Sequence, residues 1–330
     1  MHANFAPDLN ETILLPAVDS WPDAFHRFDA ESVLAVQTAL AIGRPLLLRG
    51  EPGIGKSQLA RAVAAILKSP FLYHVMDERS ERDDLLHFND AVARLAEAQV
   101  CAHLAKANED WREVLSERNF MRPGVLWWAF DWESAKVQAA RFRADGRRVC
   151  KEPVAPAGWT PEAAQACGPV VLIDEIDKAD PSVPNGLLEC LGNKGFQIAQ
   201  IGEGVELPEG NKPPLIMITT NEERELPSAF LRRCLVLHLE FPSTLEAGIE
   251  FLWLRGKRLA KKLGLEKDLC CVVAECICRD REEARGRMAL PGAAEYLDLL
   301  RALADVPNEM RKDRLDQIKK FVLQKHDSPA

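Results

Sequence analysis

The sequence lacks any long apolar stretch. No run approaches the ~18 apolar residues that a membrane-spanning helix needs, although 47% of the 330 residues are hydrophobic. The first residues carry Asp8, Glu11, Asp19 and Asp23, and they contain no apolar core of the kind found in a signal peptide. These absences predict a cytoplasmic protein that neither spans nor crosses a membrane.

An excess of positive charge is also lacking. The chain has 42 Lys and Arg against 50 Asp and Glu, which gives a formal net charge of −8. This balance argues against a protein that mainly coats DNA or RNA, although it leaves room for a local basic channel. One basic segment lies within residues 141–151. It fits a solvated helix face, or a contact with an acidic partner or nucleic acid.

The nine cysteines follow no disulfide or zinc pattern. An odd count, with no export signal, is most simply explained by reduced thiols in the cytosol. Four cysteines fall within residues 270–278, but this stretch has no Gly or Pro to turn ligands toward one point. We therefore expect a buried helix in which Cys acts as a small apolar residue, rather than a metal site.

What is present is a phosphate-binding loop. The pattern G-x-x-x-x-G-K-[ST] is matched at every fixed position by Gly50-Glu51-Pro52-Gly53-Ile54-Gly55-Lys56-Ser57. Glycines let successive backbone N–H groups point into one concavity, and the following helix adds the positive end of its dipole. Lys56 is expected to reach the β- and γ-phosphates, and the Ser57 hydroxyl to bind Mg²⁺.

The surroundings of this loop fit a nucleotide site. A short apolar strand at residues 45–48 precedes it, and apolar residues at helical spacing follow it as far as Leu67. We predict that the nucleotide-binding residues run from Gly50 through Gln58. The sequence therefore predicts an ATP or GTP site with Mg²⁺.

A second strong signal is the apolar run Val170–Ile173, which leads into Asp174 and Glu175. A buried parallel strand would present these acids at its carboxyl end, beside the phosphate loop. We expect Asp174 to hold Mg²⁺, directly or through water, and Glu175 to polarise the attacking water. Asn221 ends a further apolar strand at 215–220 and either holds that water or caps the strand.

Paired arginines, Arg232 and Arg233, precede a strand at residues 235–239. They form either a surface charge pair or a donor that reaches a neighbouring subunit's site, because a guanidinium group matches phosphate oxygens. Elsewhere, we predict a helix from Asp29, a strand at 71–75, a helical pattern over 90–118 and a hairpin around Gly202. Three tryptophans within residues 127–132 indicate packing in a local core or against another element or subunit.

The order of these motifs resembles an AAA+ ATPase, in the branch of the MoxR family and dynein-type modules. The resemblance covers about residues 30–305. It is carried by five sequence segments, namely Gly50–Ser57, Leu172–Asp177, Leu187–Leu191 with the hairpin that follows, Thr220-Asn221, and Leu226–Arg233.

The resemblance implies an α/β fold: a parallel sheet in the order 5-1-4-3-2 with helices on both faces, followed by a small helical lid. The implied domains are an irregular segment at 1–29, a large ATP-binding domain at 30–242 with insertions at about 88–168, and a lid at 243–330. Such modules form hexameric rings with ATP between subunits. Arg233 matches the arginine finger best, with Arg232 in reserve.

Proteins of this family act as chaperone-like ATPases that remodel or activate a protein partner, often beside a protein with a von Willebrand factor A domain. One departure is at Leu290-Pro291-Gly292, where the family usually offers a lid arginine. Arg285 or Arg287 could replace it. Two alternatives therefore stay open beside a ring ATPase: an ATP-binding switch with little turnover, and a nucleic-acid motor of a restriction-type complex.

Overall fold

A computed structural model of the protein describes residues 5–18, 21–104, 111–143, 149–283 and 290–322. The chain divides into two compact units. The first unit is formed mainly by residues 35–47 and 63–236, and the second by residues 6–34, 48–62 and 237–322. The predicted domain boundary at residue 242 stays a prediction.

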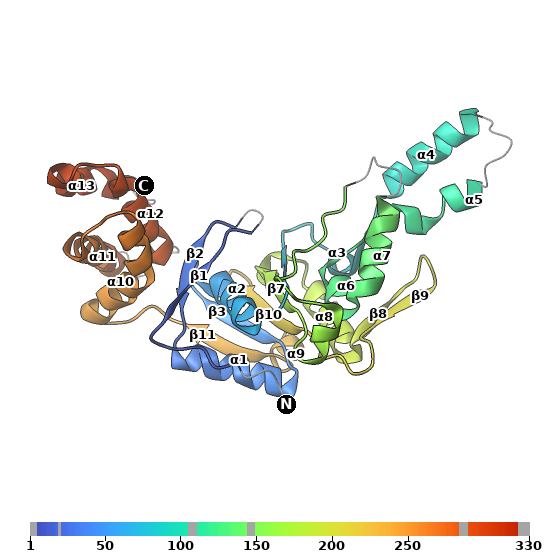
Figure 1. The fold of residues 1–330 in the computed structure, drawn as a ribbon, viewed down its shortest axis with the longest axis horizontal. Helices are drawn as coiled ribbons and strands as arrows, with labels where there is room; N and C mark the ends of the chain where they lie inside the picture. Colours follow the sequence, from blue (N-terminus) through green and yellow to red (C-terminus); the bar gives the residue numbers. More distant parts are fainter. Residues whose placement is uncertain (1–4, 19–20, 105–110, 144–148, 284–289, 323–330) are drawn as a thin grey trace. The chain divides into compact units, whose positions relative to one another are not determined.

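The central element is a five-stranded parallel sheet in the order β11-β3-β10-β7-β4 (Figure 1). In chain order, its strands are β3 (Leu46–Gly50), β4 (Phe71–Val75), β7 (Val170–Asp174), β10 (Leu215–Thr220) and β11 (Leu235–Leu239). Counted along the chain, this is the predicted order 5-1-4-3-2. In register, Val170 of β7 lies beside Leu215 on one side and Phe71 on the other. All six residues of β10 are buried, as a strand covered on both faces requires.

One face of the sheet is covered in the first unit by helix α6 (Val125–Phe130), which packs against β4 and β7. Val171 and Ile173, alternate residues of β7, contribute to the same buried cluster as Trp127 and Trp128. The Trp127 indole N–H donates to the Ser134 hydroxyl at 2.8 Å. The tryptophan segment therefore belongs to the core of its own chain.

Between β4 and β7 the chain forms an insertion of short elements. In chain order these are α3 (Arg82–Leu86), β5 (His87–Asn89), α4 (Ala91–Leu104), α5 (Trp111–Val114), a 3₁₀ helix (Glu117–Phe120), β6 (Met121–Pro123), α6, α7 (Trp132–Phe142) and a second 3₁₀ helix (Pro161–Gln165). Strands β5 and β6 pair antiparallel. Where the structure describes residues 90–118, the predicted helical pattern is present as α4, α5 and the start of the 3₁₀ helix Glu117–Phe120. The apolar side chains of Val92 and Val100 on α4 are exposed, at 80% and 48%.

The predicted hairpin is confirmed as β8 (Gly195–Ile198) paired antiparallel with β9 (Glu203–Glu206). It follows α8 (Ser182–Asn193) in the first unit. Gly195 is required where the strands approach, because an added Cβ would lie 2.4 Å from the Val205 carbonyl oxygen. Helix α9 (Ser228–Leu231) then leads to the paired arginines.

The N-terminal segment differs from the irregular structure expected for residues 1–29. Strands β1 (Thr12–Leu15) and β2 (Ala24–Arg27) form an antiparallel pair in the second unit. Prolines at 16 and 22 flank the strands and made the segment look irregular. Their carbonyls instead accept hydrogen bonds from Arg61 of α2 (Lys56–Leu67), at 2.8 and 3.2 Å. The hairpin is thus tied to the helix that follows the phosphate loop.

Helix α1 (Ala30–Ile42) starts directly after Asp29, the predicted cap residue. The Asp29 carboxylate accepts from the Ser32 backbone N–H at 2.8 Å. The second unit also contains the predicted C-terminal helices: α10 (Leu245–Lys262), α11 (Lys267–Glu283), α12 (Ala293–Ala304) and α13 (Arg311–Val322). Figure 1 shows these four helices grouped together. In the part of the chain that the structure describes, no helix is both long and apolar enough to cross a membrane.

The cysteines at 270–278 lie on α11, as the helix prediction required. Cys270 and Cys278 point into the core of the helical group, beside Leu252, Ile277 and Tyr296. Burial raises the pKa of both thiols to about 11, so they stay protonated at neutral pH. All nine cysteines are free thiols.

Candidate functional site

The phosphate loop Gly50–Ser57 has the backbone that its glycines predict. Gly50, Gly53 and Gly55 have φ values of 143°, 77° and 104°, a region that L side chains rarely adopt. A Cβ added at Gly50 would lie only 2.3 Å from the Leu239 carbonyl oxygen, so the loop passes β11 at a spacing that only glycine allows. Helix α2 begins at Lys56, directly after the third of these glycines.

Lys56 places its ammonium group at the centre of this loop. Its side chain is buried, and Nζ donates to the carbonyl oxygens of Gly50 at 2.6 Å and of Glu51 at 3.0 Å. A buried ammonium needs such acceptors, since an unpaired charge in the interior is costly. A cation held inside a ring of glycines, at the start of a helix, fits a phosphate group.

Two arginines of the C-terminal helices contact the phosphate loop within the second unit. Arg281 of α11 pairs with the Glu51 carboxylate at 2.6 Å and donates to the Pro291 carbonyl at 2.7 Å. Its side chain is only 11% exposed and lies over the Phe241 ring, 4.1 Å from the centroid. The guanidinium group of Arg281 is therefore held in one orientation by the Glu51 carboxylate, the Pro291 carbonyl and the Phe241 ring.

Arg255 of α10 contacts the same loop from another helix. Its guanidinium donates to the Ile54 carbonyl at 3.3 Å and lies 3.5 Å from the centroid of the Phe251 ring. Burial lowers the pKa of Arg255 to about 10, and Asp29 opposes that shift. Buried His26 lies in the same surroundings, and burial, then the charge of Arg255, lower its pKa to about 3. His26 is therefore neutral at pH 7.

The position expected to carry a lid arginine is Gly292, which caps α12. Its backbone N–H donates to the Glu295 carboxylate at 2.9 Å. The next residues of α12 approach the loop, since a Cβ added at Gly53 would lie 3.4 Å from the Ala294 Cβ. Arg285 and Arg287 lie outside the described residues. Among the described residues of the C-terminal helices, Arg281 and Arg255 contact the phosphate loop.

In the first unit, Asp174 ends β7 and Glu175 directly follows it, at the predicted carboxyl end of the strand. The Thr219 hydroxyl of β10 donates to the Asp174 carboxylate and accepts from the Glu175 backbone N–H at 2.9 Å. Glu175 has left-handed backbone angles, with φ 59° and ψ 47°, which a non-glycine residue adopts only under constraint. The Thr219 side chain thus holds the turn that presents Glu175.

Asn221 directly follows β10, as predicted, and its side chain contacts Glu175. Its side-chain amide donates to Glu175 Oε1 at 3.3 Å. Buried Asp177 holds the same turn, because its carboxylate accepts from the backbone N–H groups of Asn221 at 3.4 Å and Glu223 at 3.0 Å. The structure therefore brings Glu175 and Asn221 together. Asp177 braces the turn beside this pair, and no role of its own was predicted for it from the sequence.

Arg232 and Arg233 follow α9 with exposed side chains. Their backbone is fixed from elsewhere: Arg44 donates to the carbonyls of Arg232, of Arg233 at 2.9 Å and of Cys234 at 3.4 Å. A single guanidinium thus gathers three successive carbonyls. No sequence pattern marks Arg44, because its partners lie almost 190 residues away.

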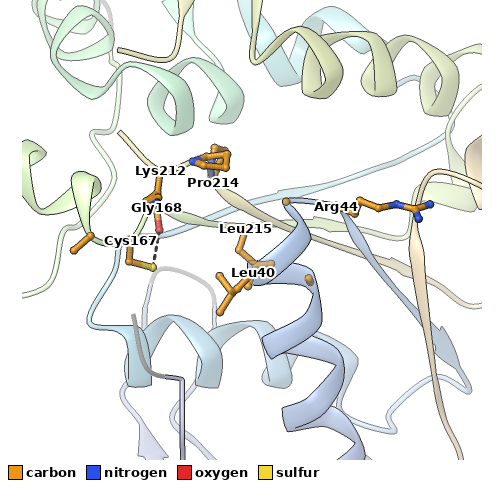
Figure 2. A pocket seen from close by; sticks show the side chains of 11 residues that line it. Leu40, Arg44, Cys167, Gly168, Lys212, Pro214 and Leu215 are labelled. Atoms are coloured by element: carbon orange, nitrogen blue, oxygen red, sulfur yellow. Dashed lines mark hydrogen bonds between the residues drawn. The ribbon is translucent and has the colours of Figure 1, made fainter. Parts of the chain in front are cut away.

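Arg44 also lines a small pocket of the first unit, together with Leu40, Cys167, Lys212 and Leu215 (Figure 2). Figure 2 shows the Arg44 side chain extending away from Leu40 and Leu215. The pocket has a volume of about 30 Å³, which is room for a water molecule but far too little for a nucleotide. Burial raises the pKa of the Cys167 thiol to about 11. The pocket therefore does not compete with the phosphate loop as a nucleotide site.

The basic segment at 141–151 makes internal contacts where the structure describes it. Arg141 donates to the Asn119 side chain at 2.9 Å, and Arg143 pairs with Glu152. Arg147 and Arg148 lie outside the described residues. The residues predicted to bind nucleotide lie in the second unit and those around Glu175 in the first, so the shared Mg²⁺ site of Ser57 and Asp174 stays a prediction.

Comparison with known proteins gives one family match. The family described as AAA domain (dynein-related subfamily) matches residues 45–234. The structure of the RuvB Holliday junction branch migration motor of Thermotoga maritima is similar to this chain, with 14% sequence identity and a TM-score of 0.45. The aligned part covers 90% of this chain and 70% of the RuvB chain. A proposed ATPase from Cytophaga hutchinsonii is also 14% identical, covering 91% of this chain and 89% of its own, with a TM-score of 0.38. The curated proteins include no match.

Proposed function

The chain belongs to the dynein-related subfamily of AAA domains, and we propose that it is a Mg²⁺-dependent enzyme that hydrolyses ATP. The phosphate loop carries this proposal. Three glycines with positive φ surround the buried Lys56 ammonium, which two loop carbonyls hold in place. Phosphate oxygens would replace those carbonyls as acceptors, so the cation is prepared for an anion before one arrives.

The proposed roles follow the chemistry of phosphoryl transfer. Ser57 and Asp174 would hold Mg²⁺, which when bound neutralises charge on the phosphates. Glu175 polarises the attacking water, and the Asn221 amide orients it. The hydrogen bond between Asn221 and Glu175 supports this pairing, because both groups must face the same water.

We further propose that the protein assembles as a hexameric ring in which Arg233 completes the site of a neighbouring subunit. Its exposed side chain is available to a second copy, and Arg44 fixes the backbone that carries it. Arg232 is the reserve candidate. A guanidinium supplied from a neighbour stabilises charge on the transferring phosphoryl group.

The biological role that fits this assembly is remodelling or activation of a protein partner in the cytoplasm. This rests on the resemblance to MoxR proteins, and a protein with a von Willebrand factor A domain is a proposed partner on the same ground. Arg281 and Arg255 are proposed to couple the lid to the loop in place of the arginine missing at Gly292. Their contacts with Glu51 and Ile54 support that assignment.

The experiment is ATP hydrolysis per protomer measured against protein concentration, for wild type and Arg233→Ala in parallel. We expect the rate to rise with concentration in wild type and to stay low in the variant. Glu175→Gln should bind ATP but lose nearly all turnover. Unchanged turnover in Glu175→Gln would remove the role of Glu175, absence of ATP turnover in wild type would remove the ATPase proposal, and a concentration-independent rate in wild type would remove the shared site.

A second candidate, an ATP-binding switch with little turnover, is favoured by one observation. Both oxygens of the Glu175 carboxylate are engaged, by Lys178 and by Asn221. If this arrangement persists with nucleotide bound, Glu175 does not reach water. A flat, low rate in both wild type and Arg233→Ala, together with ATP-dependent assembly, would favour the switch.

A further inference from the structure

Lys178 forms an ion pair with Glu175 that the roles above do not use. Its Nζ lies 2.8 Å from Glu175 Oε2, while Asn221 donates to Oε1. The two residues are three apart, and residues 176–178 form a 3₁₀ helix. Glu175 is the N-cap of this helix, and its carbonyl oxygen accepts from the Lys178 backbone N–H at 3.0 Å, so one turn brings the two residues together. The direction of that carboxylate is therefore fixed on both sides.

Resting on the proposed ATPase function, we propose that Lys178 is a positioning residue that holds Glu175 in a resting orientation, and that turnover requires their ion pair to open. A general base must face the proton that it accepts, with an oxygen within hydrogen-bond reach of the water. A carboxylate drawn toward Lys178 does not present Oε2 to that water. Opening the pair frees this oxygen while Asn221 keeps its hold on the other.

Further negative charge surrounds Lys178. Its hydrogen bond with Glu175 raises the pKa of Lys178, and the charges of Glu223 and Asp177 act in the same direction. Asp177 is buried and accepts from the Glu223 backbone N–H. When the pair with Glu175 opens, Lys178 therefore stays in negatively charged surroundings.

The ion pair is weak enough to serve as a switch. The two side chains are 36% and 30% exposed, and ion pairs at such positions change an equilibrium constant by up to about fivefold. Loss of the ion pair between Lys178 and Glu175 should therefore raise turnover several-fold rather than by orders of magnitude. ATP binding should change little, since Lys178 lies outside the phosphate loop.

The test compares Lys178→Met with a matched control, Lys319→Met. Lys319 makes an ion pair with Asp316 at the same 2.8 Å and the same spacing of three residues, far along the chain. We expect Lys178→Met to raise kcat about two- to fivefold with an unchanged KM for ATP, and Lys319→Met to match wild type. Lys178→Arg, which keeps a cation beside Glu175, should give a smaller rise than Lys178→Met.

A double variant, Lys178→Met with Glu175→Gln, should show no turnover, since the gain passes through Glu175. If Lys178→Met fails to fold, Lys178→Gln provides the same comparison. An unchanged or reduced kcat in the folded variant, with turnover still lost in Glu175→Gln, overturns this inference and leaves the ATPase proposal standing. Full turnover in Glu175→Gln would remove the role of Glu175 and this inference with it, whereas absence of turnover in wild type would remove the ATPase proposal.

Discussion

The Arg44 guanidinium donates to the backbone carbonyl of Arg233 across 2.9 Å and also holds the carbonyls on either side. One side chain at the end of α1 therefore fixes the turn that presents the arginine finger candidate. A finger that acts on a neighbouring subunit must be held in place before that subunit arrives, since a loose side chain loses entropy on docking.

We predict that Arg44→Met lowers ATP turnover by loosening this turn, without weakening ATP binding. Hydrogen bonds from a charged donor contribute ~1.5–3 kcal/mol where they are not fully solvated, so unfolding should also become easier by about 1–2 kcal/mol. Turnover against protein concentration and denaturant unfolding measure the two effects.

Arg311→Met is the control for this change. Arg311 likewise holds two carbonyls, of Val306 at 2.8 Å and Ala304 at 3.4 Å, in the helical group. It should lose comparable stability and keep the concentration dependence of turnover. Equal turnover defects in the two variants would mean that Arg44 acts through stability alone.

Gly50→Ala should abolish ATP binding and destabilise the protein by at least ~2 kcal/mol, because strain and overpacking add. The added Cβ would lie 2.3 Å from the Leu239 carbonyl oxygen, and the backbone φ of 143° disfavours a side chain. Thermal unfolding and equilibrium ATP binding are the measurements. Gly264→Ala, at φ 65° with no described atom within 4 Å of its Cβ, should retain binding.

Arg281→Met should weaken ATP binding about fivefold or more, which corresponds to ~1 kcal/mol. The change removes the ion pair to Glu51 and the bond to the Pro291 carbonyl, and so frees the loop from α11. Arg279→Met breaks a more exposed pair with Glu275 on the same helix and should bind ATP as wild type does. Equal affinities in both variants would contradict a role for Arg281 at the loop.

Stability should fall as pH decreases from about 6.5, partly because of His26. Its pKa is about 3 in the folded protein, so below 6.5 the unfolded chain takes up a proton that the folded chain does not. At pH 5 this costs about 1.36 × 1.5, or ~2 kcal/mol. Burial also lowers the pKa of His74 and His87, so they add loss in the same direction.

His26→Gln should therefore make the decline between pH 7 and pH 5 shallower by that amount, in urea unfolding followed at several pH values. Arg255 and Asp29 are the charged groups that act on His26. A parallel decline in wild type and variant would show that His26 does not stay neutral in the folded protein.

The predicted part of the site consists of residues whose roles follow from neighbours in the chain. Local sequence is enough to predict a glycine loop between a strand and a helix, or acidic residues at the end of an apolar strand. The structure has the expected backbone at Gly50–Ser57 and at Asp174-Glu175. The arginines were missed because their contacts span 189, 201 and 230 residues for Arg44, Arg255 and Arg281. Tertiary packing determines such contacts, and the spacing of apolar residues along the sequence does not predict them.

Two other differences have local causes. The β1–β2 hairpin was hidden by flanking prolines, whose carbonyls take the hydrogen bonds of Arg61. Lys178 was only three residues from Glu175, yet the ion pair depends on a 3₁₀ turn rather than a wider helix. The sheet order was predicted because motif order along the chain implies a known topology.

The tryptophan arrangement also determines what an optical experiment reports. Trp132 lies edge-on to Trp128 at 5.1 Å and to Trp159 at 4.8 Å between ring centroids, all within the first unit. Such close, fixed rings dominate near-ultraviolet circular dichroism, whereas α10–α13 contribute mainly to the far-ultraviolet helix signal. Near-ultraviolet melting would therefore follow the first unit, and a separate far-ultraviolet transition at another temperature would show that helices outside these rings unfold independently.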